Sequence, residues 1–336
     1  MLAPAARLWA CNIRGRPLIM NIALVGVGKI AKSQHVPNIF MSDAWNLVAT
    51  VALEGTVEGV DSYTDFDQFL LERTDVEVVS FCVPAIARFE YAVKALKAGL
   101  HVMLEKPPGA TISEINHLQE LAEACDRTLF TTWHSQMAPG VSPAKEWLAD
   151  KVIEEATVTW HEDIRQFHVN NAGDDRDRDG HRGVRNQDWI FEPGGIGVFD
   201  TGINAISILT EIVPHPLRVT EASLVYPENR GQPIQAELIF DSVVQASFNF
   251  RHEGKPIWDM HIVTDQGELR LERSATILRI DDVQYELGPS QEYARLYSRM
   301  SELISSGESE VNVDPLIVVA DIFMIGARHV SVPFNF

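Results

Sequence analysis

The chain has 336 residues, of which 46% are hydrophobic, and a formal net charge of −19 at pH 7. This length predicts about two domains, each large enough to bury a core. The acidity argues against nucleic acid as a partner, because a phosphate backbone requires basic surface. No apolar run approaches the roughly 20 residues that span a bilayer, so we expect no membrane partner.

Three cysteines are present, and their spacing fits neither a metal site nor a disulfide framework: Cys11, Cys82 and Cys125. Structural disulfides belong to oxidising compartments. The cysteine usage therefore favours a reduced, cytoplasmic setting, and we expect no metal.

Residues 1–19 precede the first strand pattern and contain three arginines among alanines and leucines. They weakly resemble a targeting leader but lack a continuous apolar core and a clear cleavage site. We interpret them as an extension from an upstream start codon, with Met20 as the natural beginning.

The first strand pattern runs from Asn21 to Val25 and leads into a glycine-rich turn of the form G-x-G-x-x-A, which ends at Ala31. The first glycine of such a turn permits a tight bend, the second lets the backbone approach a pyrophosphate, and the small third residue lets helix pack on strand. N–H groups at the helix start would face the phosphates. The motif predicts dinucleotide contacts from Gly26, Gly28, Lys29 and Ile30.

Strand and helix patterns alternate after this turn. The segments that read as strands are 47–53, 76–84, 100–104 and 129–133, and those that read as helices are 89–99 and 111–124. We expect Ser113 to cap the second helix. Such alternation indicates a parallel sheet, so residues 20–136 are predicted to form a doubly wound, NAD(P)-binding Rossmann domain.

The second strand of such a domain usually ends in an acidic residue that binds the ribose hydroxyls. That position falls at Leu53, and Glu54 follows it. Glu54 could serve from one residue further on, which favours NAD. A missing acid would instead leave room for the 2′-phosphate of NADP, although no Arg or Lys is close by. The cofactor is therefore expected to be NAD or NADP, with NAD slightly favoured.

Lys106 lies in Glu-Lys-Pro-Pro, directly after the strand pattern of residues 100–104. Proline cannot donate to a ladder and ends the strand, so the lysine is expected at the carboxyl edge of the sheet, where doubly wound folds bind ligands. An ordinary solvated Lys–Glu pair is the alternative. Val83 and Pro84 end an earlier strand pattern and, with Glu105 and Lys106, complete the predicted cofactor contacts.

The pattern changes beyond residue 136. A helix is expected over 143–148, an exposed strand over 155–163, and successive antiparallel strands over 236–240, 245–251, 258–264 and 268–272. Residues 137–336 are therefore predicted to form an α+β substrate and dimerisation domain with a large, mainly antiparallel open sheet. Its C-terminal segment could pack back on the first domain.

A second glycine-rich segment, 194–204, turns helical at Asp200. On a helix, Asp200 and Asn204 lie one turn apart on the same face, and they offer one possible base and one amide. The alternative is that Asp200 is an N-cap and Asn204 a surface residue. Because the helix is otherwise apolar, a carboxylate on it needs a buried partner.

The combination of G-x-G-x-x-A, strand-end Glu-Lys-Pro and G-G-x-x-x-D-x-G-x-(H or N) resembles the Gfo/Idh/MocA oxidoreductase family from Asn21 to the C-terminus. Many members have His where this chain has Asn204, whereas the aldose 1-dehydrogenases of the family resemble it in having Asn. The stretches that carry the resemblance are 28–31, 34–37, 105–108, 133–135, 160–165 and 198–210.

The resemblance implies NAD(P)-dependent oxidation of an aldopyranose, D-galactose or L-arabinose, at C1 to the aldonolactone. Lys106 would polarise the C1 hydroxyl, and Asp200, oriented by Asn204, is the candidate base, with Lys106 the alternative base. A homo-oligomer, a dimer through the C-terminal sheet, is also implied. The expected sugar contacts are His134, Glu162, Phe167, His168 and Trp258.

Two departures from the family pattern bear on the substrate. Phe167 stands where Trp is expected before His168, and an added charged stretch fills residues 170–187. His181 and the aspartates of that stretch fit a solvated loop better than a metal site. Alternative functions are dehydrogenation of another polyol or a dihydrodiol, and a non-catalytic nucleotide-binding sugar sensor or regulator on the same fold.

Overall fold

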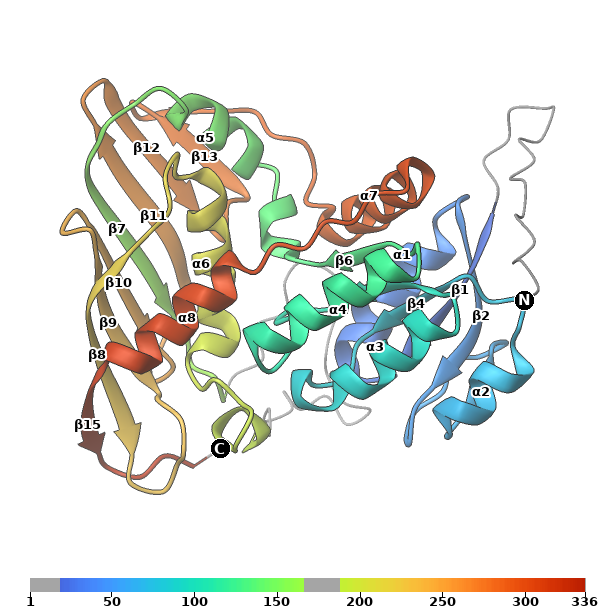
Figure 1. Cartoon of the computed structure of the whole chain (residues 1–336). Helices are drawn as coiled ribbons and strands as arrows, with labels where there is room; N and C mark the ends of the chain where they lie inside the picture. The colour runs from blue at the N-terminus through green and yellow to red at the C-terminus, as the bar shows by residue number, and fades with distance from the viewer. Residues whose placement is uncertain (1–18, 166–187, 336) are drawn as a thin grey trace.

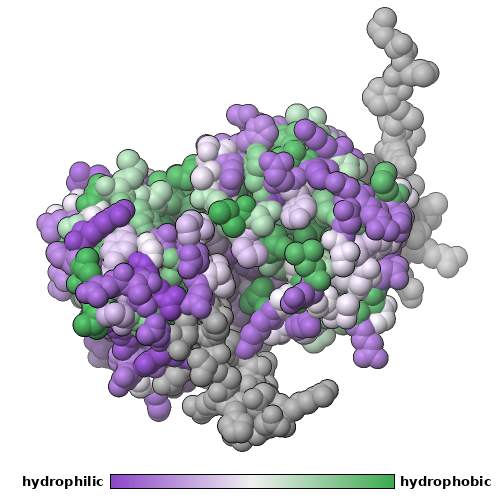
Figure 2. All heavy atoms as spheres, turned by 90° about the horizontal axis from the view of Figure 1, so that it is seen from below, coloured by the Kyte–Doolittle hydropathy of each residue, from purple (hydrophilic) through white to green (hydrophobic). Residues whose placement is uncertain are grey.

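The computed structural model describes residues 19–165 and 188–335 of the chain. Two sheets organise this part of the protein, one formed within residues 20–131 and the other within residues 153–331 (Figure 1). Seen from below, the molecule has two lobes with a hollow between them (Figure 2). Residues 1–18 of the N-terminal extension, Phe167, His168 and the charged stretch around His181 lie outside the described residues.

The first sheet has six strands, and every neighbouring pair is parallel. Their order in the sheet is β3-β2-β1-β4-β5-β6. From β1 the chain adds strands toward one edge as far as β3, and from β4 it adds them toward the other edge. A doubly wound sheet opens a crevice for a ligand at this switch point between β1 and β4. The prediction of a doubly wound α/β fold is thereby confirmed. The strands are β1 (Met20–Val25), β2 (Trp45–Val51), β3 (Asp61–Tyr63), β4 (Val78–Phe81), β5 (His101–Leu104) and β6 (Leu129–Thr131).

Helices cover both faces of this sheet. The apolar sides of α2, α3 and α4 pack on one face. The expected cap at Ser113 is wrong: Thr111 caps α4, and its hydroxyl and the Glu114 carboxylate form a reciprocal capping box. The helical segments here are the π-helical turn η1 (Ala31–His35), α1 (Val36–Phe40), α2 (Phe66–Glu72), η2 (Ala85–Ala87), α3 (Arg88–Lys97), α4 (Ile112–Ala124) and η3 (His134–Met137).

The opposite face is covered by α1 and by α7 (Glu292–Ser306), a helix from the last fifth of the chain (Figure 1). Apolar residues recur along α7 at helical spacing and are buried against β1, β4, β5 and β6. Those residues are Tyr293, Leu296, Tyr297, Met300 and Leu303. The second half of the sequence therefore supplies part of the core of the first.

The second sheet has nine strands in the order β14-β13-β12-β11-β7-β10-β9-β8-β15. Most neighbours are antiparallel, as expected, but β10 runs parallel to β7, and β15 runs parallel to β8. The strand expected to be exposed, β7, lies at the centre of the sheet. The strands are β7 (Ile153–His161), β8 (Val219–Pro227), β9 (Gln235–Phe240), β10 (Val244–Asn249), β11 (Ile257–Thr264), β12 (Gly267–Glu272), β13 (Ile277–Ile280), β14 (Val283–Gln284) and β15 (Ala327–Ser331).

One face of this sheet packs on α5 (Val141–Leu148), α6 (Phe199–Ile212) and α8 (Asp314–Ile325) (Figure 1). The alternation along β10 shows why: Val244, Ala246 and Phe248 are buried, and the residues between them are not. Burial alternates along β7 too, because described helices cover only one face of the sheet. This alternation is why the sequence of β7 suggests an exposed strand. The short turn η4 (Asp188–Phe191) precedes α6.

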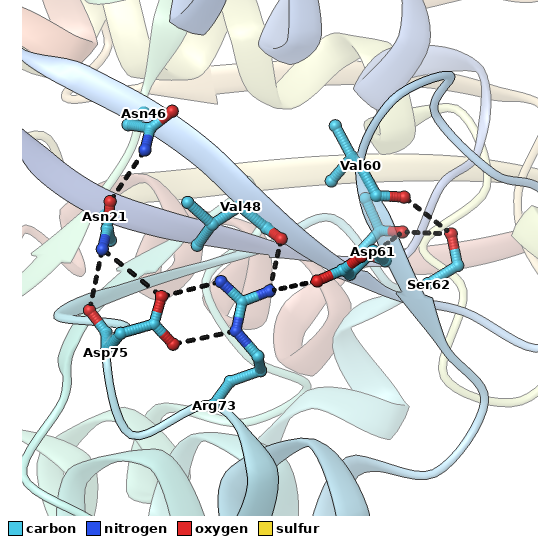
Figure 3. Close-up of polar contacts among 9 residues, drawn as sticks. Asn21, Asn46, Val48, Val60, Asp61, Ser62, Arg73 and Asp75 are labelled. Atoms are coloured by element: carbon cyan, nitrogen blue, oxygen red, sulfur yellow. Dashed lines mark hydrogen bonds and ion pairs between the residues drawn. The ribbon is translucent and has the colours of Figure 1, made fainter.

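Arg73 joins the strands β2 and β3 of the first sheet to the loop before β4 (Figure 3). Its guanidinium donates to the Val48 carbonyl at 2.6 Å, to Asp61 at 3.0 Å and to both carboxylate oxygens of Asp75. The hydrogen bond to Asp75 raises the pKa of Arg73 and lowers that of Asp75.

No helix in the described part of the chain has the length and apolar character that crossing a membrane requires.

Candidate active site

The glycine-rich turn connects β1 to η1 beside the carboxyl end of β4. Gly26 has φ +94°, and a Cβ there would lie 2.8 Å from the Val83 nitrogen, so only glycine fits. A Cβ at Gly28 would meet nothing within 4 Å, and Ala31 is fully buried. One closed position, one open position and one small packed residue are what the approach of a pyrophosphate to this backbone requires. The turn therefore fits a dinucleotide.

Glu54 lies in the turn after β2, which ends at Val51, and it is exposed. The next residue, Gly55, has φ +88° and is so close to the glycine-rich turn that a Cβ would lie 2.8 Å from the Val27 carbonyl oxygen. Glu54 is thus held beside the predicted phosphate site. Its predicted contact with the ribose fits this placement and stays a prediction.

Lys106 and Asp200 lie 94 residues apart in the sequence, and the fold brings them together between the two lobes. The ammonium of Lys106 donates to the backbone carbonyl of Asp200 at 2.7 Å, and its Nζ lies 3.7 Å from Asp200 Oδ1. The two side chains are only 16% and 8% exposed. A cation at the end of β5 and a carboxylate in the first turn of α6 therefore share one largely desolvated site.

The start of α6 decides between the two interpretations of Asp200. The helix begins at Phe199 with Val198 before it, so Asp200 lies in the first turn and is not the N-cap. A carboxylate at this place is stabilised by the helix dipole. Asn204 follows one turn later, and among the described contacts its side chain makes no hydrogen bond to Asp200. Its orienting role stays a prediction.

Two predicted sugar contacts lie at or near the end of β7. Glu162 follows β7, is buried, and accepts a hydrogen bond from the hydroxyl of Thr201, the neighbour of Asp200. Trp258 on β11 stacks on Trp160 of β7, with ring centroids 5.9 Å apart. The end of β7 thus places the Glu162 carboxylate next to Thr201, the neighbour of Asp200. The Trp160–Trp258 pair lies two residues earlier, across β7 and β11.

His134, the third predicted sugar contact within the described residues, opens η3 after β6. Its Nδ1 is buried with no hydrogen-bond partner in the described structure. Burial lowers the pKa of His134, so the ring is neutral at neutral pH. Two residues later, Gln136 donates to the Ser207 carbonyl at 3.0 Å and ties η3 to α6.

Arg88, at the start of α3, carries no signal in the sequence pattern. Its buried guanidinium donates to the carbonyl oxygens of Val83, Glu105 and Pro107. Burial lowers its pKa to about 10, so it stays a cation at neutral pH. Arg88 therefore holds the loop after β4 against the loop after β5. Both loops carry predicted cofactor contacts, Pro84 among them.

A buried polar cluster lies under Lys106, and its members from α7 also had no sequence signal. Glu105 Oε1 accepts a hydrogen bond from the Tyr293 hydroxyl at 2.8 Å and lies 3.2 Å from His35 Nε2, while Glu105 Oε2 accepts the Lys106 N–H at 2.8 Å. His35 Nδ1 lies 2.7 Å from the Tyr297 hydroxyl. Both oxygens of the Glu105 carboxylate are thus engaged by groups of the protein itself.

Within this cluster, His35 and Glu105 stabilise one another's charged forms. Burial lowers the pKa of His35, but Cys82, Tyr297 and Glu105 outweigh it and raise the pKa well above its ordinary value. Burial raises the pKa of Glu105, but the hydrogen bond and charge of His35, with the charge of Lys106, bring it well below its usual range. His35 and Glu105 therefore form a buried ion pair at neutral pH.

No group of three or more His, Cys, Asp or Glu side chains within residues 19–165 and 188–335 is arranged to hold a metal ion.

The oxidoreductase family with an NAD-binding Rossmann fold matches residues 20–132. Galactose 1-dehydrogenase of Pseudomonas fluorescens is 34% identical over 92% of this chain and 96% of its own length.

Solved structures agree with that likeness. The crystal structure of D-galactose-1-dehydrogenase from Rhizobium etli has a TM-score of 0.85 and 44% identity, covering 94% of this chain and 98% of that one. A 3-ketoreductase from Actinomadura kijaniata, in complex with NADP and TDP-benzene, has a TM-score of 0.75 at 16% identity, covers 93% of this chain and 99% of its own, and shows the fold alone.

The doubly wound sheet with its dinucleotide turn, together with these likenesses, identifies a nicotinamide-dependent oxidoreductase. The chain belongs to the Gfo/Idh/MocA oxidoreductase family.

Proposed function

We propose that this protein oxidises an aldopyranose at C1, D-galactose or L-arabinose, to the aldonolactone with NAD or NADP. The observation that carries the mechanism is the Lys106–Asp200 pair, in which the ammonium lies 2.7 Å from the Asp200 carbonyl oxygen and 3.7 Å from its carboxylate. The substrate class rests on two relatives named galactose 1-dehydrogenase, each matching more than nine tenths of the chain.

The residues present support each part of this chemistry. When bound, the oxidised nicotinamide supplies the acceptor for the hydride that leaves C1. One N–H of the Lys106 ammonium is used by the Asp200 carbonyl, and the other two can stabilise negative charge developing on the C1 oxygen. The Asp200 carboxylate accepts the proton of the C1 hydroxyl as the bond between C1 and this oxygen becomes the lactone carbonyl. The turn from Gly26 to Ile30, Glu54, Val83 and Pro84 would hold the cofactor.

Sugar recognition is assigned to the polar groups around this pair. Glu162, next to Thr201, and His134, whose Nδ1 has no partner in the described structure, would bind ring hydroxyls. Trp258 would lie against the apolar face of the sugar. Phe167 and His168 are proposed contacts from sequence. An intact Lys106 and Asp200 favour an enzyme over the non-catalytic sensor.

We also propose a homodimer through the nine-stranded sheet. The helices α5, α6 and α8 cover one face, while the alternate residues of β7, β10 and β11 on the other face are partly exposed. A second copy would cover that face. Cys82 and Cys125 are free thiols, which suits the proposed cytoplasmic setting.

A panel of sugars tests the substrate. D-Galactose and L-arabinose should be oxidised with a kcat/KM roughly 10- to 100-fold above that of D-glucose, since glucose differs from galactose at C4 and would leave a buried polar group unpaired, at about 1–3 kcal/mol. Glu162→Gln should reduce this ratio, whereas Glu120→Gln, exposed on α4, should leave it unchanged. Equal efficiency on glucose and galactose would contradict the assignment, and activity on inositol or a diol alone would move the enzyme elsewhere in the family.

A further inference from the structure

Tyr293 of α7 contacts two residues of the candidate site, Glu105 and His134. Its hydroxyl donates to Glu105 Oε1 at 2.8 Å, across 188 residues of sequence. Its ring stacks on that of His134, with centroids 5.5 Å apart and an interplanar angle of 18°. The side chain is 6% exposed, so it cannot itself contact a bound sugar along much of its surface.

The hydrogen bond from Tyr293 bears on Lys106 through one residue. Glu105 Oε2 accepts the backbone N–H of Lys106 at 2.8 Å, and so the orientation of this carboxylate fixes where the lysine leaves the strand. Without the tyrosine hydroxyl, Glu105 Oε1 would keep only His35, at 3.2 Å. A carboxylate whose Oε1 keeps only this longer contact is less firmly oriented, and the Lys106 peptide bonded to its Oε2 can shift with it.

The stacking contact bears on His134. Among the described residues its Nδ1 has no hydrogen-bond partner, so ring packing contributes to its orientation. Tyr293 provides the parallel face. Loss of the ring would allow the imidazole to turn, whereas loss of the hydroxyl alone would not.

We propose that Tyr293 is a positioning residue, which holds Lys106 through the Glu105 carboxylate and holds His134 through ring stacking. This inference rests on the proposed function, since it concerns the residues assigned there to the C1 hydroxyl and to the sugar. His35 and Tyr297 complete the support, because the Tyr297 hydroxyl lies 2.7 Å from His35 Nδ1 and orients the imidazole that pairs with Glu105. Glu105 then serves the site from inside the core.

Two substitutions separate the two contacts. Tyr293→Phe removes the hydroxyl and keeps the ring, and it should lower kcat about 10-fold while the KM values for sugar and nicotinamide stay within about two-fold, because misplaced reacting groups slow the chemical step. Tyr293→Leu removes both contacts and should also raise the KM for the sugar several-fold. Active sites are counted by titration with reduced nicotinamide, so that unfolded protein does not enter kcat.

Tyr226→Phe is the matched control. Tyr226 lies on β8, packs beside Arg328 and is not part of the site, so its kcat should equal that of the wild type. A purely structural role for Tyr293 would lower the melting temperature and leave kcat per site unchanged in Tyr293→Phe. That result would overturn the proposal.

A second readout does not depend on turnover. Lys106 Nζ is held by the Asp200 carbonyl, and a loosened loop should expose the amine to acetic anhydride. Acetylation of Lys106, followed by peptide mass spectrometry, should be several-fold faster in Tyr293→Phe, with the exposed Lys94 and Lys145 as internal standards. An unchanged rate would overturn the positioning role. If the wild type oxidises no sugar, the proposed function fails while this labelling result still decides the role of Tyr293.

Discussion

The two sides of the candidate site are built in different ways. The cofactor side consists of short segments that directly follow β1, β2, β4 and β5, so that the sheet itself aligns them. The opposite side takes Asp200 from α6, Glu162 from the end of β7 and His134 from η3, and α7 supports it from the far end of the chain. Local patterns can therefore place residues at a sheet edge, whereas the contacts that join Lys106 to Asp200 and Glu105 to Tyr293 depend on how distant segments pack.

The largest effect on this comparison should come from the α6 side. Asp200→Asn keeps the shape of the side chain in the first turn of α6 and removes the base, so kcat should fall by about 10²- to 10⁴-fold. Steady-state kinetics with D-galactose, and titration of reduced nicotinamide to show that the cofactor site persists, would measure this.

Asp150→Asn is the control for that substitution, because Asp150 is an exposed partner of Lys151 outside the site. Its turnover should match the wild type. Near-normal turnover of Asp200→Asn would show that the helix side does not supply the base, and would leave Lys106 as the candidate.

A smaller effect should come from the cofactor side. No Lys or Arg lies between Lys32 and Arg73, and the Arg73 guanidinium is engaged by Asp61 and Asp75. Glu54 would repel a 2′-phosphate, so we expect kcat/KM with NAD to exceed that with NADP roughly 10-fold, equivalent to about 1.4 kcal/mol.

Glu54→Gln should narrow that ratio of NAD to NADP efficiency by raising activity with NADP. Glu58→Gln, exposed four residues further along the same loop, should not change it. A wild-type preference for NADP would show that Glu54 does not select the cofactor.

Sequence patterns are sufficient for the parts of the fold whose cause is local. Gly26 needs its positive φ, and Lys106 follows an apolar strand that proline ends, so the local pattern alone assigns both to the sheet edge. The predicted cap of α4 is two residues away from the observed one, because Thr111 and Ser113 are equally good caps by type. Only the reciprocal bond with Glu114 decides between them.

What could not be predicted depends on tertiary contacts. The periodicity of α7 fits burial on any apolar surface, and nothing in it indicates the six-stranded sheet or a hydrogen bond from Tyr293 to Glu105. The parallel pairing of β10 with β7 is equally invisible, since strand patterns do not record direction. Arg88 is a single arginine whose three carbonyl partners come from two separate loops.

The central claim is that a lysine from the six-stranded sheet and an aspartate from α6 form one catalytic site. Lys106→Ala tests it most directly, with D-galactose turnover and reduced-nicotinamide binding measured on the same preparation. The predicted result is loss of turnover with the nicotinamide dissociation constant changed less than about three-fold, because the ammonium acts on the sugar oxygen and the glycine-rich turn on the cofactor. A Lys106→Ala protein as active as the wild type would contradict the account.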